Sequence, residues 1–194
     1  IIHPVNQDIY KSDYDYKIPE KLIARYPPKN RTDSKLLLCK DQNFSIKNFS
    51  SISNFFKKDD LIVFNETKVF KARLRLQKES GGQTEIFINR ILSKFEAECL
   101  TKGLNLKKKS QVLKTNTFPL KISIVKEKDG LVLMKFSQNV EHLCSIYGKV
   151  PIPPYLKRDD DESDNVRYQT VFANDALKES AAAPTASLHF DKNL

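Results

Sequence analysis

The segment RLRLQKESGGQTEIFINRI, residues 73–91, decides the fold more than any other part of the chain. Arginine and leucine alternate at its start, two glycines follow at Gly81 and Gly82, and a second run rich in isoleucine and phenylalanine begins at Glu85. An apolar side chain at every second position, followed by a glycine pair, is typical of two β-strands joined by a turn. The segment therefore predicts antiparallel sheet in the middle of the chain.

The same pattern of strands and turns continues to about residue 137. Residues 95–100 can pair back on the strand that begins at Glu85, and residues 120–125 and 131–136 flank the dipeptide Asp129-Gly130. Asp-Gly between two alternating runs is a strong signal of a tight hairpin. We therefore expect residues 71–137 to form a small antiparallel sheet or barrel.

The regions on either side of this sheet have other patterns. Residues 19–26 predict a short helix, and residues 139–147 predict a helix that begins at an asparagine cap and ends at Gly148. Residues 36–38 predict a short buried strand. Residues 61–64 form an uninterrupted apolar run, which favours a strand covered on both faces.

The composition is that of an ordinary globular protein, with 194 residues, 40% of them hydrophobic, and a net charge of +9. The longest apolar stretches are far shorter than the roughly 20 residues that a membrane helix needs. Residues 1–10 lack the basic and apolar stretches of a secretory signal. We therefore expect a cytoplasmic protein, in which Cys39, Cys99 and Cys144 are buried reduced thiols.

The scarcity of glycine and histidine excludes several common classes of enzyme. The five glycines cannot be arranged into a dinucleotide fingerprint or a phosphate-binding loop. The serine-hydrolase elbow and the paired-histidine motif of zinc proteases are absent from the sequence, and no cysteines and histidines have zinc-site spacing. We therefore expect no metal site.

The positive charge is concentrated in the expected sheet. Eight lysines lie between Lys102 and Lys128, against the single acidic residue Glu127. Such a surface would attract a nucleic-acid backbone, although a solvated lysine-rich face explains the composition equally well. The acidic run from Asp159 to Asp164 is read as a solvated loop, because it lacks the alternating ligands and glycine of a calcium loop.

Several segments match one family of enzymes. Together they resemble the signatures of the S-adenosylmethionine:tRNA ribosyltransferase-isomerases of queuosine biosynthesis. Four blocks occur in the family's order: LIVFNETKVFKARL (61–74), VPIPPYLKRDD (150–160), VRYQTVFA (166–173) and AAAPTASLHF (181–190). Two further segments fit the same pattern, YDYKIPEKLIARYPPKNRTDSKLLL (14–38) and SGGQTEIFI (80–88). This sequence departs from the family pattern at Lys71, where the family has proline, and at Ser187, where it has glycine.

The resemblance implies a fold and an organisation of domains. It implies an α/β protein whose large domain, residues 1–70 and 138–194, is interrupted by a small antiparallel β-barrel-like domain, residues 71–137. Members of the family are longer, so the resemblance covers their N-terminal part only. It therefore implies a large domain without its C-terminal half, and a truncated chain that is inactive or the product of a pseudogene. Such a chain would be a monomer that needs a separate C-terminal fragment.

The resemblance also implies an activity. Members of the family transfer and isomerise the ribose moiety of S-adenosylmethionine onto 7-aminomethyl-7-deazaguanine in tRNA. The product is epoxyqueuosine, and adenine and methionine are released. The implied partners are the anticodon arm of tRNA and S-adenosylmethionine as a cosubstrate, without a metal or a membrane. The alternative function is that of a non-catalytic remnant that binds RNA through its basic sheet. A third possibility is a decayed, largely unfolded product.

The candidate site residues lie in the matching blocks. The chemistry requires a base beside the sulfonium, a hydrogen-bond donor for the departing adenine and groups that hold the substrates in line. His189 is the best base, because histidine exchanges a proton near neutral pH. The other catalytic candidates are Asn65 and Thr185, and the cosubstrate-binding candidates are Arg73, Tyr155 and Arg158.

Each candidate also has a structural interpretation. His189 could be a buried histidine bonded to the backbone, and Asn65 and Thr185 could be turn residues. Arg73 could be a solvated side chain of the small domain. Tyr155 and Arg158 could serve packing and the surface.

Overall fold

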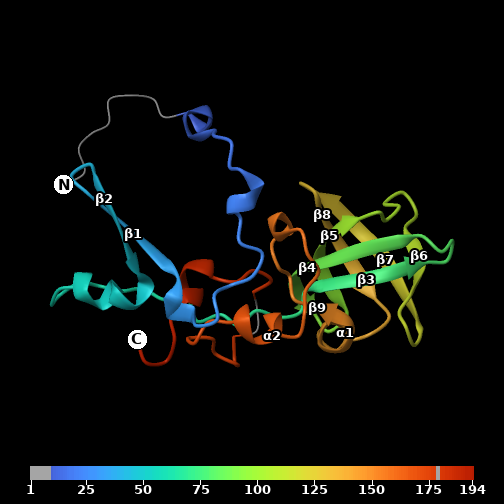
Figure 1. Ribbon diagram of the computed structural model, residues 1–194. Coiled ribbons are helices and arrows are strands. Elements are labelled where there is room, and N and C mark those ends of the chain that lie inside the picture. The colour runs from blue at the N-terminus through green and yellow to red at the C-terminus, as the bar shows by residue number, and fades with distance from the viewer. Residues whose placement is uncertain (1–9, 178–179) are drawn as a thin grey trace.

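A computed structural model describes residues 10–177 and 180–194 of the chain. The expectations for residues 1–9 fall outside these ranges. The described part is mostly sheet with few helices, and it has two regions that differ in construction (Figure 1). Within these ranges, none of the helices has the length and apolar character needed to cross a membrane.

The first region is a closed antiparallel barrel of six strands. Their order around the barrel is β4-β5-β8-β7-β6-β3, and pairing of β3 with β4 closes the ring. The strands are β3 (Arg73–Lys78), β4 (Gln83–Ser93), β5 (Glu96–Lys102), β6 (Ser110–Lys114), β7 (Pro119–Lys128) and β8 (Leu131–Phe136). Asp129 and Gly130, both at positive φ, join β7 to β8 in a two-residue turn. The hairpins predicted at Gly81-Gly82 and at Asp129-Gly130 are confirmed.

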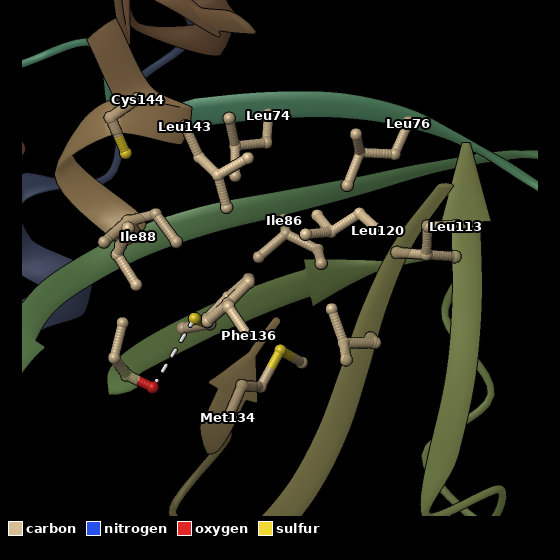
Figure 2. Packing of buried hydrophobic residues seen from close by; sticks show 14 of the residues in the cluster. Leu74, Leu76, Ile86, Ile88, Leu113, Leu120, Met134, Phe136, Leu143 and Cys144 are labelled. Carbon is tan, nitrogen blue, oxygen red and sulfur yellow. Dashed lines mark hydrogen bonds between the residues drawn. The ribbon is translucent and has the colours of Figure 1, made fainter. Parts of the chain in front are cut away.

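The interior of the barrel explains why these residues form strands. Alternate residues along each strand point inward and are fully buried, including Leu74 on β3, Ile86 on β4 and Met134 on β8 (Figure 2). Burial of each such side chain contributes about 1.5–3 kcal/mol of hydrophobic stabilisation. Because the ring is closed, these six strands satisfy one another's hydrogen bonds and the barrel has few unprotected edges.

Helix α1 (Val140–Tyr147) packs its apolar side chains into the core of the barrel. Leu143 and Cys144 belong to the same buried cluster as Leu74 and Ile88, and Figure 2 shows them beside each other. The side chain of Asn139 accepts a hydrogen bond from the backbone N–H of His142 at 3.1 Å, which confirms the predicted cap.

Strand β9 (Gly148–Lys149) pairs with the start of β3 and forms the joint between the two regions. Gly148 has an extended backbone with φ −71°, so it is not a left-handed helix end. Its role is close approach, because a Cβ atom there would lie 2.0 Å from the carbonyl oxygen of Lys71 and 2.2 Å from that of Cys144. The chain therefore enters and leaves the barrel at the same place.

The second region, here called the groove lobe, comprises residues 10–70 and 150–194 as far as they are described. Its regular elements are the hairpin of β1 (Lys35–Lys40) with β2 (Asn43–Asn48), the short helix α2 (Asp164–Arg167) and several 3-10 helices. Isolated parallel bridges join Thr67 to Asn174 and Val69 to Ser180. The 3-10 helices are Lys11–Tyr14, Glu20–Leu22, Arg31–Asp33, Phe49–Phe55, Pro154–Leu156 and Thr185–His189.

Several predictions for the groove lobe are wrong. Residues 19–26 form only the 3-10 helix Glu20–Leu22, because Leu22 and Tyr26 are exposed and no core face stabilises a longer helix. Residues 61–64 are neither a strand nor covered, and the strand at residues 36–38 exists within β1 but leaves Leu37 exposed. Cys39 is also exposed, whereas Cys99 and Cys144 are buried as expected.

Candidate functional site

A groove of about 700 Å³ lies between segments from opposite ends of the chain. One wall is formed by residues 22–28 with Arg31, and a second wall by the Pro-Pro-Tyr segment, residues 152–158. Residues of α2 and of the 3-10 helix Thr185–His189 complete the lining. The groove thus brings together Tyr155, Arg158, Thr185 and His189, four of the six predicted site residues.

Arg158 is the central tie of the groove. Its Nη1 and Nη2 donate to the two carboxylate oxygens of Asp164 at 2.6 and 2.7 Å, and its Nε donates to the carbonyl oxygen of Arg25 at 2.7 Å. The guanidinium also lies over the ring of Tyr26, 4.3 Å from its centroid. This hydrogen-bonded pair lowers the pKa of Asp164 and raises the pKa of Arg158. Arg158 therefore fastens both walls to α2.

The acidic run after Arg158 is largely solvated, as the sequence suggests, since Asp159, Asp161 and Glu162 are exposed, but two of its members are paired with arginines. Asp164 is buried against Arg158, and Asp159 accepts a hydrogen bond at 2.6 Å from Arg75 of β3. The buried pair of Asp164 with Arg158 therefore fixes the end of the run at the groove, whereas the exposed pair of Asp159 with Arg75 contributes little. Asp164 is only six residues from Arg158, but Arg75 is 84 residues from Asp159, so the pattern of charges along the chain could not reveal the second pair.

Arg31 is a second tie, and the sequence analysis missed it. Its guanidinium donates to the carbonyl oxygens of Leu188 at 2.9 Å, Val166 at 2.9 Å and Gln169 at 2.7 Å. Partial burial lowers its pKa, and the nearby charge of Arg167 lowers it further. Because these bonds reach two separate segments, Arg31 holds the 3-10 helix of His189 against α2. The only available signal was its place in the opening block that matches the family, residues 14–38.

His189 is half-buried on the groove wall. Its ring lies against the ring of Phe49, with 5.2 Å between the centroids. Burial lowers the pKa of His189 below its usual 6.5, and the positive charge of Arg31 lowers it further. The imidazole is therefore neutral near pH 7 and can accept a proton. Thr185 begins the same 3-10 helix and is exposed to the groove.

Three tyrosines line the groove. Tyr26 lies under Arg158, Tyr155 is exposed on the Pro-Pro-Tyr wall, and Tyr168 is half-buried beyond α2. Burial raises the pKa of Tyr168, and proximity to Tyr155 raises it further. Aromatic faces of this kind can stack on a flat heterocycle such as a purine. Tyr26 and Tyr168 are the other residues that the sequence analysis did not single out.

The remaining two candidates lie outside the groove lining. The side-chain oxygen of Asn65 accepts hydrogen bonds from the backbone N–H of Thr67 at 2.8 Å and from its hydroxyl at 2.5 Å, which forms a local turn. Arg73 lies behind the Pro-Pro-Tyr wall, where its Nη2 donates to the carbonyl oxygen of Ile152 at 3.2 Å. Its Nε is 3.6 Å from a carboxylate oxygen of Glu85 and is buried without a hydrogen bond among the described residues.

The lining of the groove supplies several kinds of polar and aromatic side chain. In residues 10–177 and 180–194, no group of three or more histidine, cysteine or carboxylate side chains is placed to hold a metal ion. The groove offers a neutral imidazole, a hydroxyl and aromatic faces, and arginines engaged with backbone carbonyls and a carboxylate make its framework.

Comparison with known proteins finds curated relatives that share one name. An S-adenosylmethionine:tRNA ribosyltransferase-isomerase from Acinetobacter baumannii (strain ATCC 17978) is 40% identical over 184 residues, which are 94% of this chain and 53% of the relative. The protein of the same name from Legionella pneumophila (strain Corby) is 39% identical over 188 residues, 93% of this chain and 53% of the relative. The chain thus spans about half the length of the curated relatives it matches.

Similarity to a solved structure is weaker. The crystal structure of S-adenosylmethionine tRNA ribosyltransferase from Thermotoga maritima is 27% identical in sequence, with a TM-score of 0.34 over 75% of this chain and 52% of that chain. The sequence-based family model described as "Queuosine biosynthesis protein" matches residues 11–194, nearly the whole chain. The chain therefore belongs to the queuosine biosynthesis protein family.

Proposed function

We propose that the groove is the substrate site of a cytoplasmic S-adenosylmethionine:tRNA ribosyltransferase-isomerase. The reaction is transfer and isomerisation of the ribose moiety of S-adenosylmethionine onto 7-aminomethyl-7-deazaguanine in tRNA. It gives epoxyqueuosine and releases adenine and methionine. The observation that carries the proposal is the meeting of two family blocks in one groove, because Tyr155 and Arg158 of block 150–160 line it together with Thr185 and His189 of block 181–190.

The groove residues fit distinct parts of this reaction. His189, kept neutral by burial, accepts the proton from the carbon beside the sulfonium, and Thr185 donates a hydrogen bond to the departing adenine. Tyr155 stacks on a substrate base. Arg158 and Arg73 act on the walls of the site, since their donors bond to Asp164 and to Ile152. Asn65 shapes the turn that leads into the barrel.

The proposal includes an organisation of domains. Residues 71–137 are an inserted β-barrel domain, and residues 1–70 and 138–194 belong to a large α/β domain that this chain provides in part. The parallel bridges at Thr67 and Val69 support the α/β assignment, because parallel pairing is typical of that class. In this proposal the chain is a monomer that acts together with a further polypeptide segment.

Adenine release tests the proposed activity. The chain is incubated with S-adenosylmethionine and tRNA that carries 7-aminomethyl-7-deazaguanine. The assay is run alone and with the half of the Acinetobacter baumannii relative that this chain does not cover. We expect adenine only in the second case, reduced about 100-fold or more in His189→Gln, as for loss of a positioned base. The control His142→Gln alters an exposed residue of α1 and should retain full activity. Absence of adenine in both cases refutes the proposal.

A second function is favoured by the surface of the barrel. All eight lysines from Lys102 to Lys128 are exposed, and three of them, Lys107, Lys108 and Lys109, adjoin one another in the loop before β6. This arrangement supports binding of tRNA through its phosphates, with or without catalysis. Replacing the three lysines by glutamine should weaken tRNA binding. The slope of the logarithm of the binding constant against the logarithm of the salt concentration should become shallower by roughly 0.7–0.9 for each phosphate contact that is lost. Replacing Lys11, Lys17 and Lys21 of the groove lobe by glutamine is the charge-matched control. An equal loss of tRNA affinity in both triple variants contradicts binding through the surface of the barrel.

A further inference from the structure

Basic side chains outnumber acidic ones in the lining of the groove. Besides His189, the basic side chains of the described lining are Arg25, Arg31, Lys35, Arg158 and Arg167. Its carboxylate, that of Asp164, pairs with Arg158 at 2.6 Å, and Glu20 outside the lining pairs with Arg25 at 3.3 Å. The other three basic side chains have no carboxylate oxygen of a described residue within 4.0 Å of their charged nitrogens. The groove therefore carries positive charge that the described part of the chain does not neutralise.

Arg31 and Arg167 bind each other's segment of the chain. Arg31 donates to carbonyl oxygens on either side of Arg167, those of Val166 at 2.9 Å and Gln169 at 2.7 Å. Arg167 donates in return to the carbonyl oxygen of Pro28 at 2.7 Å, three residues before Arg31. Burial lowers the pKa of Arg31, and the charge of Arg167 lowers it further because the two guanidinium groups repel each other. The reciprocal bonds thus hold two like charges close together.

Both guanidinium groups keep donors for a ligand. A guanidinium group has five N–H donors, of which Arg31 gives three bonds to carbonyl oxygens and Arg167 gives two. A carbonyl group is a dipole without net charge, so these bonds orient the two arginines without neutralising them. Both side chains are half-buried on the wall of the groove. Oriented and partly desolvated guanidinium groups are well suited to bind a carboxylate or a phosphate.

We propose that Arg31 and Arg167 form an oxyanion subsite of the groove, which binds a carboxylate or phosphate group of the substrate. The groove volume of about 700 Å³ leaves room for the rest of a small molecule. The inference rests on the proposed function and deepens it, because both proposed substrates carry such a group. S-adenosylmethionine has the carboxylate of its methionine moiety, and tRNA has phosphodiesters. The two sources are separated by experiment.

The first comparison is between S-adenosylmethionine and its decarboxylated analogue. Both carry the sulfonium and the adenine, and only the first carries the carboxylate. Titration calorimetry with the full chain measures both dissociation constants in the wild type and in Arg167→Gln. We expect the dissociation constant of S-adenosylmethionine to rise roughly tenfold or more in the variant, as for loss of a hydrogen bond between charged groups, and that of the analogue not to rise. The control Arg90→Gln removes an exposed arginine of β4 and should bind both compounds as the wild type does.

The second comparison uses an RNA hairpin with the sequence of the anticodon arm. If the oxyanion is a phosphate of tRNA, the affinity for the hairpin falls roughly tenfold or more in Arg167→Gln and not in Arg90→Gln. The two sulfonium compounds then bind equally well to the wild type and to Arg167→Gln. Either result supports the subsite and identifies its ligand. If Arg167→Gln changes neither the binding of S-adenosylmethionine nor that of the hairpin, the inference is overturned.

The variant Arg167→Lys separates binding of the anion from support of the wall. Lysine keeps the positive charge but loses the forked bonds to the carbonyl oxygens. We expect Arg167→Lys to bind the anion more tightly than Arg167→Gln, although the two variants melt at similar temperatures. Equal affinities of the two variants would mean that Arg167 acts only as a tie, which overturns the inference. Binding through the subsite without adenine release in the two-part assay refutes the proposed reaction alone. Adenine release with unchanged binding in Arg167→Gln refutes the subsite alone.

Discussion

The barrel and the groove lobe are held together by different physical means. In the barrel, strands pair in a closed ring and bury an apolar interior, so the region satisfies its own hydrogen bonds and core. In the groove lobe, Arg31 and Arg158 tie distant segments through carbonyl oxygens and one carboxylate, and apolar residues such as Val63 remain in solvent. The contrast teaches that the barrel buries an extensive apolar core of its own, whereas the lobe joins distant segments by polar contacts beside a small cluster of aromatic rings.

The largest effect should come from the interior of the barrel. Ile86→Ala removes a fully buried side chain, so we expect the free energy of unfolding to fall by about 2–5 kcal/mol. Val63→Ala, an apolar change in the groove lobe, should change it by less than about 0.5 kcal/mol. Urea unfolding followed by circular dichroism measures both. Similar losses for the two variants would show that the regions do not differ in this way.

The next effect should be confined to the groove lobe. Asp164→Asn leaves the guanidinium of Arg158 without its buried counter-charge, at a cost of about 3 kcal/mol. Hydrogen exchange read by mass spectrometry should show faster exchange in residues 150–170, while β3–β8 keep their protection. The control Asp129→Asn lies in an exposed turn and should change neither region. Loss of protection in the barrel would contradict the separation of the two regions.

The joint between the regions should be sensitive to a single methyl group. Gly148→Ala places a Cβ atom 2.0 Å from a backbone oxygen that cannot move independently, so we expect a loss of about 1–3 kcal/mol or more. Gly82→Ala is the matched control, because its nearest neighbour is the flexible end of Lys78 and its φ is not positive. Thermal melting compares the two variants. A stable Gly148→Ala protein would show that the close approach is not required.

The smallest effect should be a pH dependence of the groove lobe. Because the folded-state pKa of His189 is below its ordinary value of 6.5, the unfolded chain binds the proton more readily. The contribution of His189 is therefore fully present above pH 6.5 and is lost as the pH falls through 6.5 toward the folded-state value. His189→Gln should remove this part of the pH dependence in urea titrations between pH 5 and 8, and His142→Gln should not. Identical profiles of the wild type and His189→Gln would contradict the effect of burial.

The sequence predicts the barrel far better than the groove lobe, for a physical reason. The alternation from Arg73 to Ile91, the Asp129-Gly130 turn and the cap at Asn139 depend on neighbours along the chain, so local pattern is sufficient. Arg31, in contrast, acts on a carbonyl 157 residues away. No periodicity reveals such a bond.

The candidate site was predictable only through the family blocks. These blocks identified Tyr155, Arg158, Thr185 and His189 as candidates, and their meeting in one groove is a tertiary result. Residues 61–64 give the clearest disagreement, since the sequence predicts a covered strand and the described chain leaves it open.

The contact of Gly148 with Lys71 places the two chain segments that connect the barrel to the rest of the protein next to each other. Because both chain crossings lie side by side, a short linker from residue 71 to residue 148 spans almost no distance. Replacement of the whole barrel by that of another family member would leave the path of the remaining chain unchanged. Protein engineering can therefore exchange this module separately from the groove.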